Sequence, residues 1–280
     1  MSESRLESPV VPAGASMRPE EEPRPLWLAV LAGARSAFAV ALLLVWMVVG
    51  GGIQRLVFWP SVRLLPGRRQ RLVALYMKMM SGGILGFVRL GGARVERPHR
   101  LPTDEPLLVV MNHQSLLDIP TVVLLSSPFV PRFIARARYG RYIPAVSLCI
   151  RELGCPLIEP SDRRGSLETL RRAAREQVHG LLIYPEGHRT RDGGIQPFRT
   201  AGLELILRER PVPVYAVVTD GFWECRRLVD VVFKLHRIQG RTEVLGPFPP
   251  PSREEIPAFL ADLRERMVRR LEEMRSARRA

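Results

Sequence analysis

The sequence predicts an α/β fold: a layered, mostly parallel sheet flanked by helices, preceded by an N-terminal membrane-associated helical segment. From about residue 93, short apolar runs alternate with helical stretches, which is typical of strand–helix units around a parallel sheet. Before that point, residues 36–54 contain no charged side chain, which is typical of a segment that enters a bilayer.

Length and composition limit the class of protein. The chain has 280 residues, of which 46% are hydrophobic, enough for one large domain with an appendage and too apolar for a wholly disordered chain. The formal net charge of +14 favours an anionic partner: nucleic acid, an acidic membrane surface or phosphorylated substrates. Cys149, Cys155 and Cys225 have no CxxC spacing, so we expect neither a disulfide framework nor a zinc site, and a reducing, cytosol-facing location.

We expect four parts along the chain. They are a disordered tail (1–25), membrane-anchoring hydrophobic and basic amphipathic helices (26–90), an α/β domain (91–250) and a C-terminal amphipathic basic helix (251–280). The tail is rich in Pro, Glu and Ser and lacks a hydrophobic period, as in disordered segments.

The first helical part is expected to lie in or on a membrane. At ~1.5 Å per residue, residues 36–54 come close to the ~30 Å apolar core of a bilayer, while Gly50, Gly51 and Gly52 weaken the end of the helix. The segment therefore either crosses the membrane or dips into one leaflet. The basic residues that follow, Arg55, Arg63, Arg68, Arg69 and Arg71, predict an inner or plasma membrane location with the main domain facing the cytoplasm.

A second apolar period follows. Apolar residues and one glycine recur at helical spacing, at Leu72, Leu75, Tyr76, Met79, Met80 and Gly83. Two interpretations stay open for this helix: it lies on an anionic membrane surface, or it is a core helix with a solvated basic face.

The remaining elements are read from apolar runs. Buried strands are expected at 107–111, 131–137, 156–159, 181–185 and 212–218, because short apolar runs bounded by turn residues favour strands. A helix is expected from Ser166 to His179, with Leu167, Leu170, Ala174 and Val178 on one face. Residues 231–246 are expected to form a later strand pair with a glycine turn.

Polar residues interrupt the apolar pattern directly after the first of these strands, in MNHQSLLDIP. His113 and Asp118 are five positions apart, so inside one helix they would point about 140° away from each other. They meet only if His113 lies in the loop and Asp118 in the first turn of the next helix. The carboxylate then fixes the imidazole tautomer and leaves the other nitrogen as a base. The alternative is a core histidine beside a capping Asn or Ser.

A second polar cluster follows the strand at 181–185. Glu186, His188, Arg189 and Arg191 lie in a glycine-containing loop, and Arg199 follows where a helix should begin. Loops at strand ends backed by helix N-termini are natural phosphate sites, and arginine holds phosphate through two parallel bonds. The alternative is a solvated charged loop.

The two clusters together, NHxxxxD at 112–118 and PEGxR at 185–189, resemble the glycerolipid acyltransferase family, the 1-acylglycerol-3-phosphate acyltransferases. The resemblance covers roughly residues 70–245. It implies transfer of a fatty acyl group from acyl-CoA or acyl carrier protein to a lysophospholipid hydroxyl, giving phosphatidic acid, with no metal and no further cofactor. It also implies His113 as general base and Asp118 as its orienting partner. The substrate-binding residues it implies are Asn112, Glu186, Gly187, Arg189, Arg163, Arg164 and Arg199.

The sequence departs from the family's pattern at several positions. In GCPLIEPSDRRGS (154–166) the arginine expected after the acid is Pro160, so Arg163 or Arg164 is expected to supply that charge. EGTRS is here EGHRT, with His188 and Thr190 as substitutions, whereas Pro213 matches the fourth block of the family. These departures keep open a related enzyme with another acceptor, such as a lyso-aminolipid.

A rival from another class is a non-catalytic, basic, membrane-anchored binding protein. The arginines lack interleaved aromatics, and no zinc, helix-turn-helix or RNP pattern occurs, so we expect no nucleic-acid partner.

Overall fold

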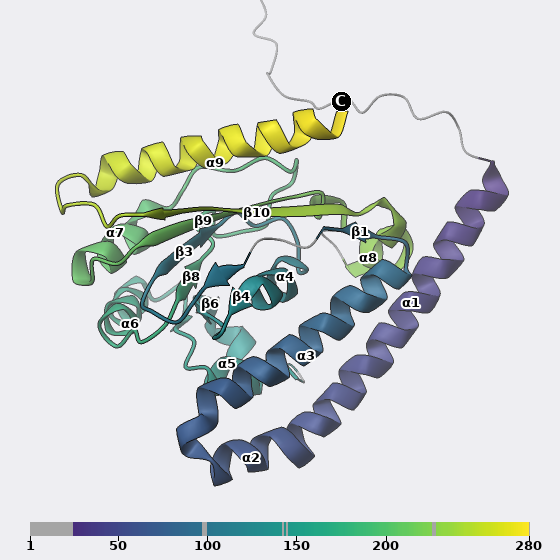
Figure 1. The fold of residues 1–280 in the computed structure, drawn as a ribbon, viewed down its shortest axis with the longest axis horizontal. Helices are drawn as coiled ribbons and strands as arrows, with labels where there is room; N and C mark the ends of the chain where they lie inside the picture. The colour runs from purple at the N-terminus through teal and green to yellow at the C-terminus, as the bar shows by residue number, and fades with distance from the viewer. Residues whose placement is uncertain (1–24, 97–99, 142, 144, 226–227, 280) are drawn as a thin grey trace, which may run out of the picture.

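A six-stranded sheet forms the centre of the molecule (Figure 1). The structure is a computed structural model and describes residues 25–96, 100–141, 143, 145–225 and 228–279. In spatial order the strands are β1 (Arg94–Val95), β10 (Gln239–Phe248), β9 (Val214–Asp220), β3 (Leu108–Met111), β8 (Leu181–Ile183) and β5 (Arg132–Phe133). Every pairing in it is parallel except β9 with β10, so the prediction of a mostly parallel sheet is confirmed.

Two small parallel ladders extend this framework. They are β2 (Leu101–Pro102) with β4 (Ser126–Ser127), and β6 (Ala135–Arg136) with β7 (Leu157–Ile158). The five strand predictions between residues 107 and 218 each coincide with at least one strand, and the run at 131–137 contains two, β5 and β6.

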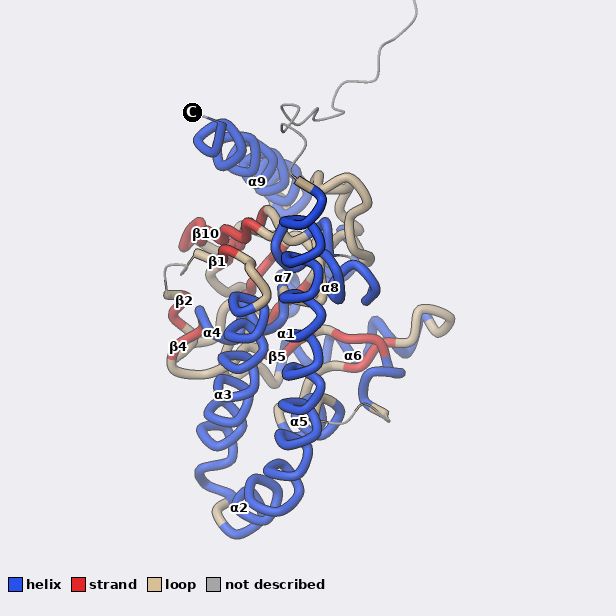
Figure 2. The backbone as a smooth tube through the Cα atoms, turned by 90° about the vertical axis from the view of Figure 1, so that its right-hand side faces the viewer, coloured by secondary structure: helices blue, strands red, loops and turns tan. Residues whose placement is uncertain are grey.

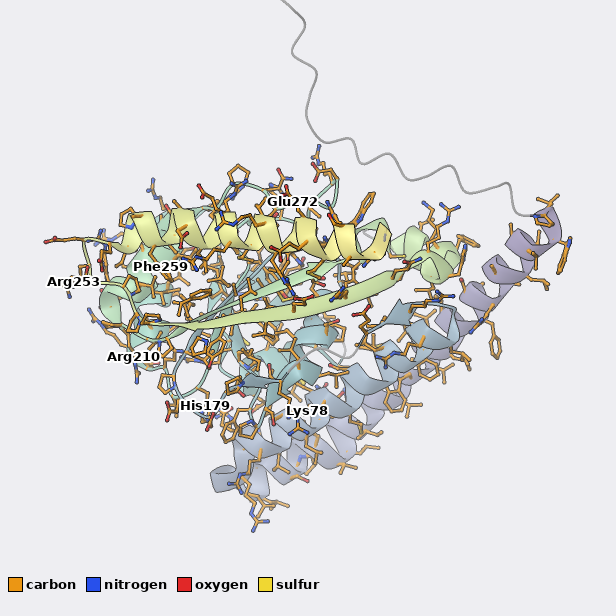
Figure 3. All side chains as sticks on the ribbon, turned by 45° about the horizontal axis from the view of Figure 1, so that its top comes forward. Lys78, His179, Arg210, Arg253, Phe259 and Glu272 are labelled. Carbon is orange, nitrogen blue, oxygen red and sulfur yellow. The ribbon has the colours of Figure 1, made fainter. Side chains whose placement is uncertain are left out.

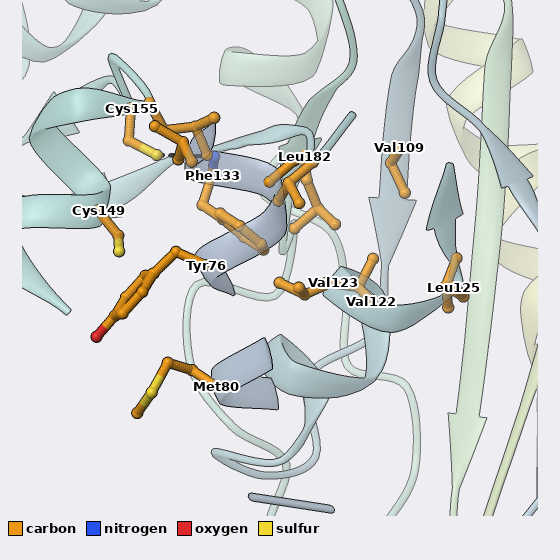
Figure 4. Close-up of a cluster of buried hydrophobic side chains, with 14 of the residues drawn as sticks. Tyr76, Met80, Val109, Val122, Val123, Leu125, Phe133, Cys149, Cys155 and Leu182 are labelled. Atoms are coloured by element: carbon orange, nitrogen blue, oxygen red, sulfur yellow. Dashed lines mark hydrogen bonds between the residues drawn. The ribbon is translucent and has the colours of Figure 1, made fainter. Parts of the chain in front are cut away.

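Both faces of the sheet are covered, as a parallel sheet requires. Along β3 the side chains alternate: Val109 and Met111 join one apolar cluster, whereas Leu108 and Val110 join another. The first cluster, part of which Figure 4 shows, packs against α3 (Arg69–Leu90), α4 (Asp118–Leu125) and α5 (Ser147–Glu152). The second packs against α6 (Arg163–Arg175), α7 (Thr200–Glu209) and α9 (Ile256–Arg279). The sheet is therefore buried between two helical layers.

Three N-terminal helices form a hairpin beside this domain. The first, α1 (Leu26–Ile53), continues through a π-helical turn (Gln54–Phe58) into α2 (Trp59–Leu64), and a 3₁₀ turn (Pro66–Arg68) leads back into α3. Figure 2 shows α1 and α3 side by side, with α2 at the tip. The Tyr76 hydroxyl donates to the Gly50 carbonyl at 2.9 Å, and the Trp46 indole donates to the Met80 carbonyl at 3.3 Å.

These helices have the length and apolarity of membrane segments. Residues 26–64 and 66–90 each form a helix long and apolar enough to cross a bilayer, and only 22% of the most apolar window of the first is buried. The predicted tail at 1–25 lies outside the described residues except for Pro25.

The predicted strand pair at 231–246 is wrong. Its first half lies in α8 (Leu228–Lys234) and a 3₁₀ turn (Leu235–Arg237), because Val232 and Leu235 pack against Ala39 and Val40 of α1. Its second half is one strand, β10. Gly240 lies inside that strand, where the Phe222 ring occupies the place of a side chain.

Two helix predictions need smaller changes. The helix expected at 166–179 spans Arg163–Arg175, because the Asp162 carboxylate accepts the Gly165 N–H at 2.9 Å and caps an earlier start. Val178 lies past its end and is exposed. The C-terminal helix α9 is integrated into the domain, since its apolar residues complete the second core cluster. Its outer side carries charged residues such as Glu272 (Figure 3).

The remaining described elements are two 3₁₀ turns, Ala137–Gly140 and Trp223–Cys225.

Candidate active site

His113 and Asp118 meet at the carboxyl edge of the sheet. β3 ends at Met111 and α4 begins at Asp118, so His113 lies in the loop between them. The His113 Nδ1 and Asp118 Oδ2 atoms are 2.7 Å apart. The histidine side chain is 19% exposed and the aspartate is fully buried. Nε2 of His113 has no hydrogen-bond partner among the described residues, so this nitrogen is the one open to a ligand.

The loop that carries His113 also donates hydrogen bonds to Asp118. Its Oδ2 atom also accepts the backbone N–H groups of Gln114 at 2.7 Å and Ser115 at 2.9 Å. When His113 carries its proton on Nδ1, the Asp118 carboxylate accepts a hydrogen bond from it, and Nε2 keeps a free lone pair.

Tyr184 covers one face of the His113 ring. It follows β8 directly, and the two rings stack with centroids 4.2 Å apart at 24°. Its hydroxyl oxygen is buried and has no hydrogen-bond partner among the described residues. Burial, with the negative charge of Asp118 as a smaller cause, raises the pKa of this phenol well above its usual value. Tyr184 therefore stays uncharged, and its ring limits the movement of the imidazole by packing against one face.

Glu186 links the two sequence motifs through the backbone. Its Oε1 accepts the His113 N–H at 2.8 Å and its Oε2 accepts the Gln196 N–H at 2.9 Å. The Thr190 N–H donates to the His113 carbonyl at 2.8 Å, so the loop after β8 holds both backbone groups of His113. Burial raises the pKa of the Glu186 carboxyl, and the two backbone N–H groups oppose that rise.

Asn112 and Gln114, on either side of His113, point away from solvent. The Asn112 amide donates to the Thr219 carbonyl at 2.9 Å and accepts the Thr219 N–H at 2.8 Å, which extends the β3–β9 pairing by one side chain. Gln114 donates to the Gly193 carbonyl at 3.0 Å and accepts the Phe222 N–H at 3.2 Å. Both side chains are fully buried. The Asn112 side chain therefore fixes the loop in this structure, and its assignment to substrate binding stays a prediction.

Arginines surround the turn at Gly187. This residue has φ +72°, and a side chain there would meet the Arg199 guanidinium at 3.1 Å, so glycine permits both the turn and the approach of Arg199. The Arg136 guanidinium reaches the Gly187 carbonyl at 3.4 Å. Arg136 and Arg199 are exposed. Arg136 was not predicted from the sequence, since its closeness depends on the β6–β7 ladder and not on any nearby motif.

The other predicted cations differ in burial and in the elements that carry them. Arg189 is half-buried in the same loop, whereas Arg163 and Arg164 are exposed in the first turn of α6. They line a surface depression together with Leu167, Glu168 and Arg171. No described contact joins Arg163 or Arg164 to His113, although the start of α6 follows the carboxyl end of β7. The described residues contain no group of three or more His, Cys, Asp or Glu side chains arranged for a metal ion.

Comparison with known proteins agrees with this geometry. A family model described as Acyltransferase matches residues 92–220, the stretch that contains both motif loops. The chain is 30% identical over 122 residues to the chloroplastic 1-acyl-sn-glycerol-3-phosphate acyltransferase BAT2 of Brassica napus, which covers 42% of this chain and 34% of the relative. It is 28% identical over 181 residues to the corresponding chloroplastic enzyme LPAT1 of Arabidopsis thaliana, which covers 63% of this chain and 46% of the relative. Residues 92–220 thus match an Acyltransferase domain, and the relatives are 1-acyl-sn-glycerol-3-phosphate acyltransferases.

The fold of the chain is also that of a solved structure. The 1-acyl-sn-glycerophosphate (LPA) acyltransferase PlsC of Thermotoga maritima superposes with a TM-score of 0.61 at 21% identity, over 84% of this chain and 95% of that one. That likeness concerns the fold. The alignments with the two plant relatives span a third to a half of those proteins' own length.

Proposed function

We propose that the chain is an O-acyltransferase that moves a fatty acyl group from a thioester donor to the free hydroxyl of 1-acylglycerol 3-phosphate, giving phosphatidic acid. The observation that carries the proposal is the His113–Asp118 pair, 2.7 Å apart, on a loop that Glu186 joins to the arginine-lined turn at Gly187. A base and an anion-binding group in one place match an acceptor that carries both a hydroxyl and a phosphate.

The reaction follows from that arrangement. His113 Nε2 takes the proton of the acceptor hydroxyl while the oxygen attacks the thioester carbonyl carbon. The imidazolium that forms is stabilised by the buried Asp118 carboxylate. When the tetrahedral intermediate collapses, the C–S bond breaks, the ester forms and the thiolate takes the proton from His113. No acyl group is attached to the protein at any step, so the chemistry needs no serine or cysteine nucleophile.

The arginines are assigned to the acceptor's phosphate. Arg199 and Arg136 meet at the Gly187 turn, and Arg189 belongs to the same loop. Arg163 and Arg164 extend the positive surface along α6. Glu186 and Asn112 are assigned to positioning of the His113 loop, because their polar atoms are occupied by backbone groups.

The N-terminal hairpin is proposed to hold the enzyme on an anionic membrane, where the acceptor resides. Apolar side chains such as Leu56, Leu64 and Leu65 are exposed near its tip, and Arg63 lies 3.9 Å from the centroid of the Trp59 ring. Exposed apolar and basic groups together favour an interface with anionic lipid. Leu116 and Ile119, next to the catalytic pair, are 47% and 39% exposed and are assigned to the acyl chains. The proposed location is the inner or plasma membrane with the catalytic domain towards the cytoplasm.

Acyl transfer from labelled acyl-CoA to lysophosphatidate, by membranes containing this protein, tests the proposal. We expect labelled phosphatidic acid, and a His113→Ala variant that forms it at least about 10²-fold more slowly, the usual contribution of a general base. A parallel assay with acyl carrier protein as donor identifies the thioester that the enzyme prefers. Near-normal turnover by the His113→Ala variant contradicts the assignment of the base.

A second acceptor class is favoured by one observation. Pro160 and His188, which replace residues of the family's pattern, are both exposed, so they alter the surface available to a head group. A lyso-aminolipid without a terminal phosphate, assayed beside lysophosphatidate, separates the two. Transfer only to the lyso-aminolipid reassigns the acceptor and leaves the chemistry unchanged. If no thioester is consumed in the presence of either acceptor, and the protein binds anionic vesicles in a salt-dependent way, the chain is a non-catalytic, membrane-anchored binding protein.

A further inference from the structure

We propose that Arg275, on the C-terminal helix α9, is a positioning residue for His113. It acts through Asp220 and Gln114, and the proposal rests on the function proposed above. Residue 275 is 162 positions from His113, yet the two belong to one chain of hydrogen bonds.

The chain of contacts begins at Gln114. Its backbone N–H donates to the Asp118 oxygen that holds the His113 ring, at 2.7 Å. Its side-chain amide donates to the Gly193 carbonyl at 3.0 Å and lies 3.4 Å from Asp220 Oδ1. A shift of the Gln114 side chain therefore moves the backbone that orients Asp118.

Asp220 needs a cation where it lies. It is the last residue of β9, its side chain is 3% exposed, and a buried carboxylate is costly unless it is paired. The Arg275 guanidinium supplies two contacts, Nη2 at 3.0 Å and Nε at 3.3 Å from Oδ1. Arg278 adds a weaker contact, 3.4 Å from Oδ2.

Arg275 also binds the loop that holds His113 from the other side. Its Nη2 donates to the Gly193 carbonyl at 2.9 Å, so that one carbonyl accepts from both Gln114 and Arg275. Gly193 belongs to the same loop as Glu186, which holds the His113 N–H. Gln114, Gly193, Arg275 and Asp220 thus form a closed ring of polar contacts behind the catalytic loop.

The attachment of α9 does not depend on this ring. Six apolar residues fix the helix in the second core cluster: Ile256, Leu260, Leu263, Met267, Leu271 and Met274. Each is at most 3% exposed. Replacement of Arg275 is therefore expected to leave the helix docked and to change the order of the loops at the site.

The test compares Arg275→Met, Arg275→Lys and a control, Arg269→Met, in the full-length protein. Arg269 is exposed on the same helix and contacts Glu265 at 3.7 Å. We expect Arg275→Met to lower kcat by at least about fivefold, within the 10²-fold loss that a displaced catalytic group produces, with KM for both substrates unchanged. Arg275→Lys should restore part of the kcat, and Arg269→Met should match the parent protein. Unchanged kcat in Arg275→Met, or a change only in KM, overturns the proposal.

Two further measurements separate positioning by Arg275 from a purely electrostatic effect and from a failure of the proposed function. In the double variant Asp220→Asn/Arg275→Met the buried charge is gone, so a purely electrostatic penalty predicts that kcat recovers, whereas positioning predicts that it stays low. Amide hydrogen exchange at residues 112–118 and 186–196 should be faster in Arg275→Met, and this readout needs no substrate. If the parent protein transfers no acyl group, the proposed function fails while the exchange result still decides whether Arg275 orders these loops.

Discussion

Glu186 and His113 are joined through the backbone: the carboxylate of the first accepts the N–H of the second at 2.8 Å. The other oxygen of Glu186 accepts the Gln196 N–H. In the proposed mechanism, the Pro-Glu-Gly sequence therefore fixes the loop that carries the base, in addition to forming the turn lined by arginines.

Glu186→Gln tests that relationship. A glutamine has one acceptor oxygen and an NH₂ group, so one of the two backbone N–H groups loses its acceptor. We expect kcat to fall by as much as about 10²-fold, the cost of a displaced catalytic group, with KM for the acceptor little changed. The control is Glu272→Gln, an exposed change on α9. A large rise in the acceptor KM with normal kcat would instead make Glu186 a substrate ligand.

Glu186 should also make the stability of the folded protein depend on pH. Burial raises the pKa of the Glu186 carboxyl, so the folded chain keeps a proton at pH values where the unfolded chain has released it. The contribution of Glu186 is then present below its ordinary pKa and is lost as pH rises through the raised value. The melting temperature of the parent protein, minus that of Glu186→Gln, should fall as pH rises across this window. A difference that grows with pH would contradict the raised pKa.

Asp118→Asn separates the charge of the carboxylate from its shape. The single oxygen Oδ2 accepts from His113 Nδ1, Gln114 N and Ser115 N, and an amide oxygen can take the same place. The variant should fold, as circular dichroism can show, but it lacks the charge that stabilises the imidazolium. We expect turnover at least about 10²-fold lower, the range of general-base catalysis. Turnover near that of the parent would remove Asp118 from the mechanism.

The sequence was sufficient to predict how His113 and Asp118 meet. Their five-residue spacing excludes contact within one helix, and α4 begins at Asp118 as that argument requires. The sequence also predicted polar loops after β3 and β8, but it did not give the strand order that makes these two strands neighbours and brings the loops together. The features that were predicted are local, or depend only on the general behaviour of parallel sheets.

Other features depend on contacts distant in sequence and could not be predicted. The run VVFK has the β-branched composition of a strand, yet it lies in α8 because α1 offers an apolar surface. Arg136 reaches the Gly187 turn only through the pairing of β6 with β7. The role of Arg275 depends on where α9 ends relative to β9. No spacing rule connects such residues.

The arginines at the Gly187 turn should govern acceptor binding. Replacement of Arg199 or Arg136 by methionine removes a charge-assisted contact of about 1.5–3 kcal/mol, so we expect the KM for lysophosphatidate to rise about 10- to 100-fold by that range. The matched control is Arg138→Met, an exposed arginine that contacts Tyr139. Donor KM should be unchanged. An effect confined to the donor would assign these arginines to the phosphates of coenzyme A.

Tyr184 offers a pair of substitutions with opposite expected results. Its ring stacks on His113, whereas its buried hydroxyl has no partner among the described residues. Tyr184→Phe keeps the ring and removes a buried polar group whose desolvation costs about 1–3 kcal/mol, so the melting temperature should rise and turnover should stay the same. Tyr184→Leu keeps an apolar group but loses the stacked ring, worth about 0.5–1.5 kcal/mol beyond its buried area, so turnover should fall several-fold. Loss of turnover in Tyr184→Phe would show that the hydroxyl, and not the ring, is what the reaction requires.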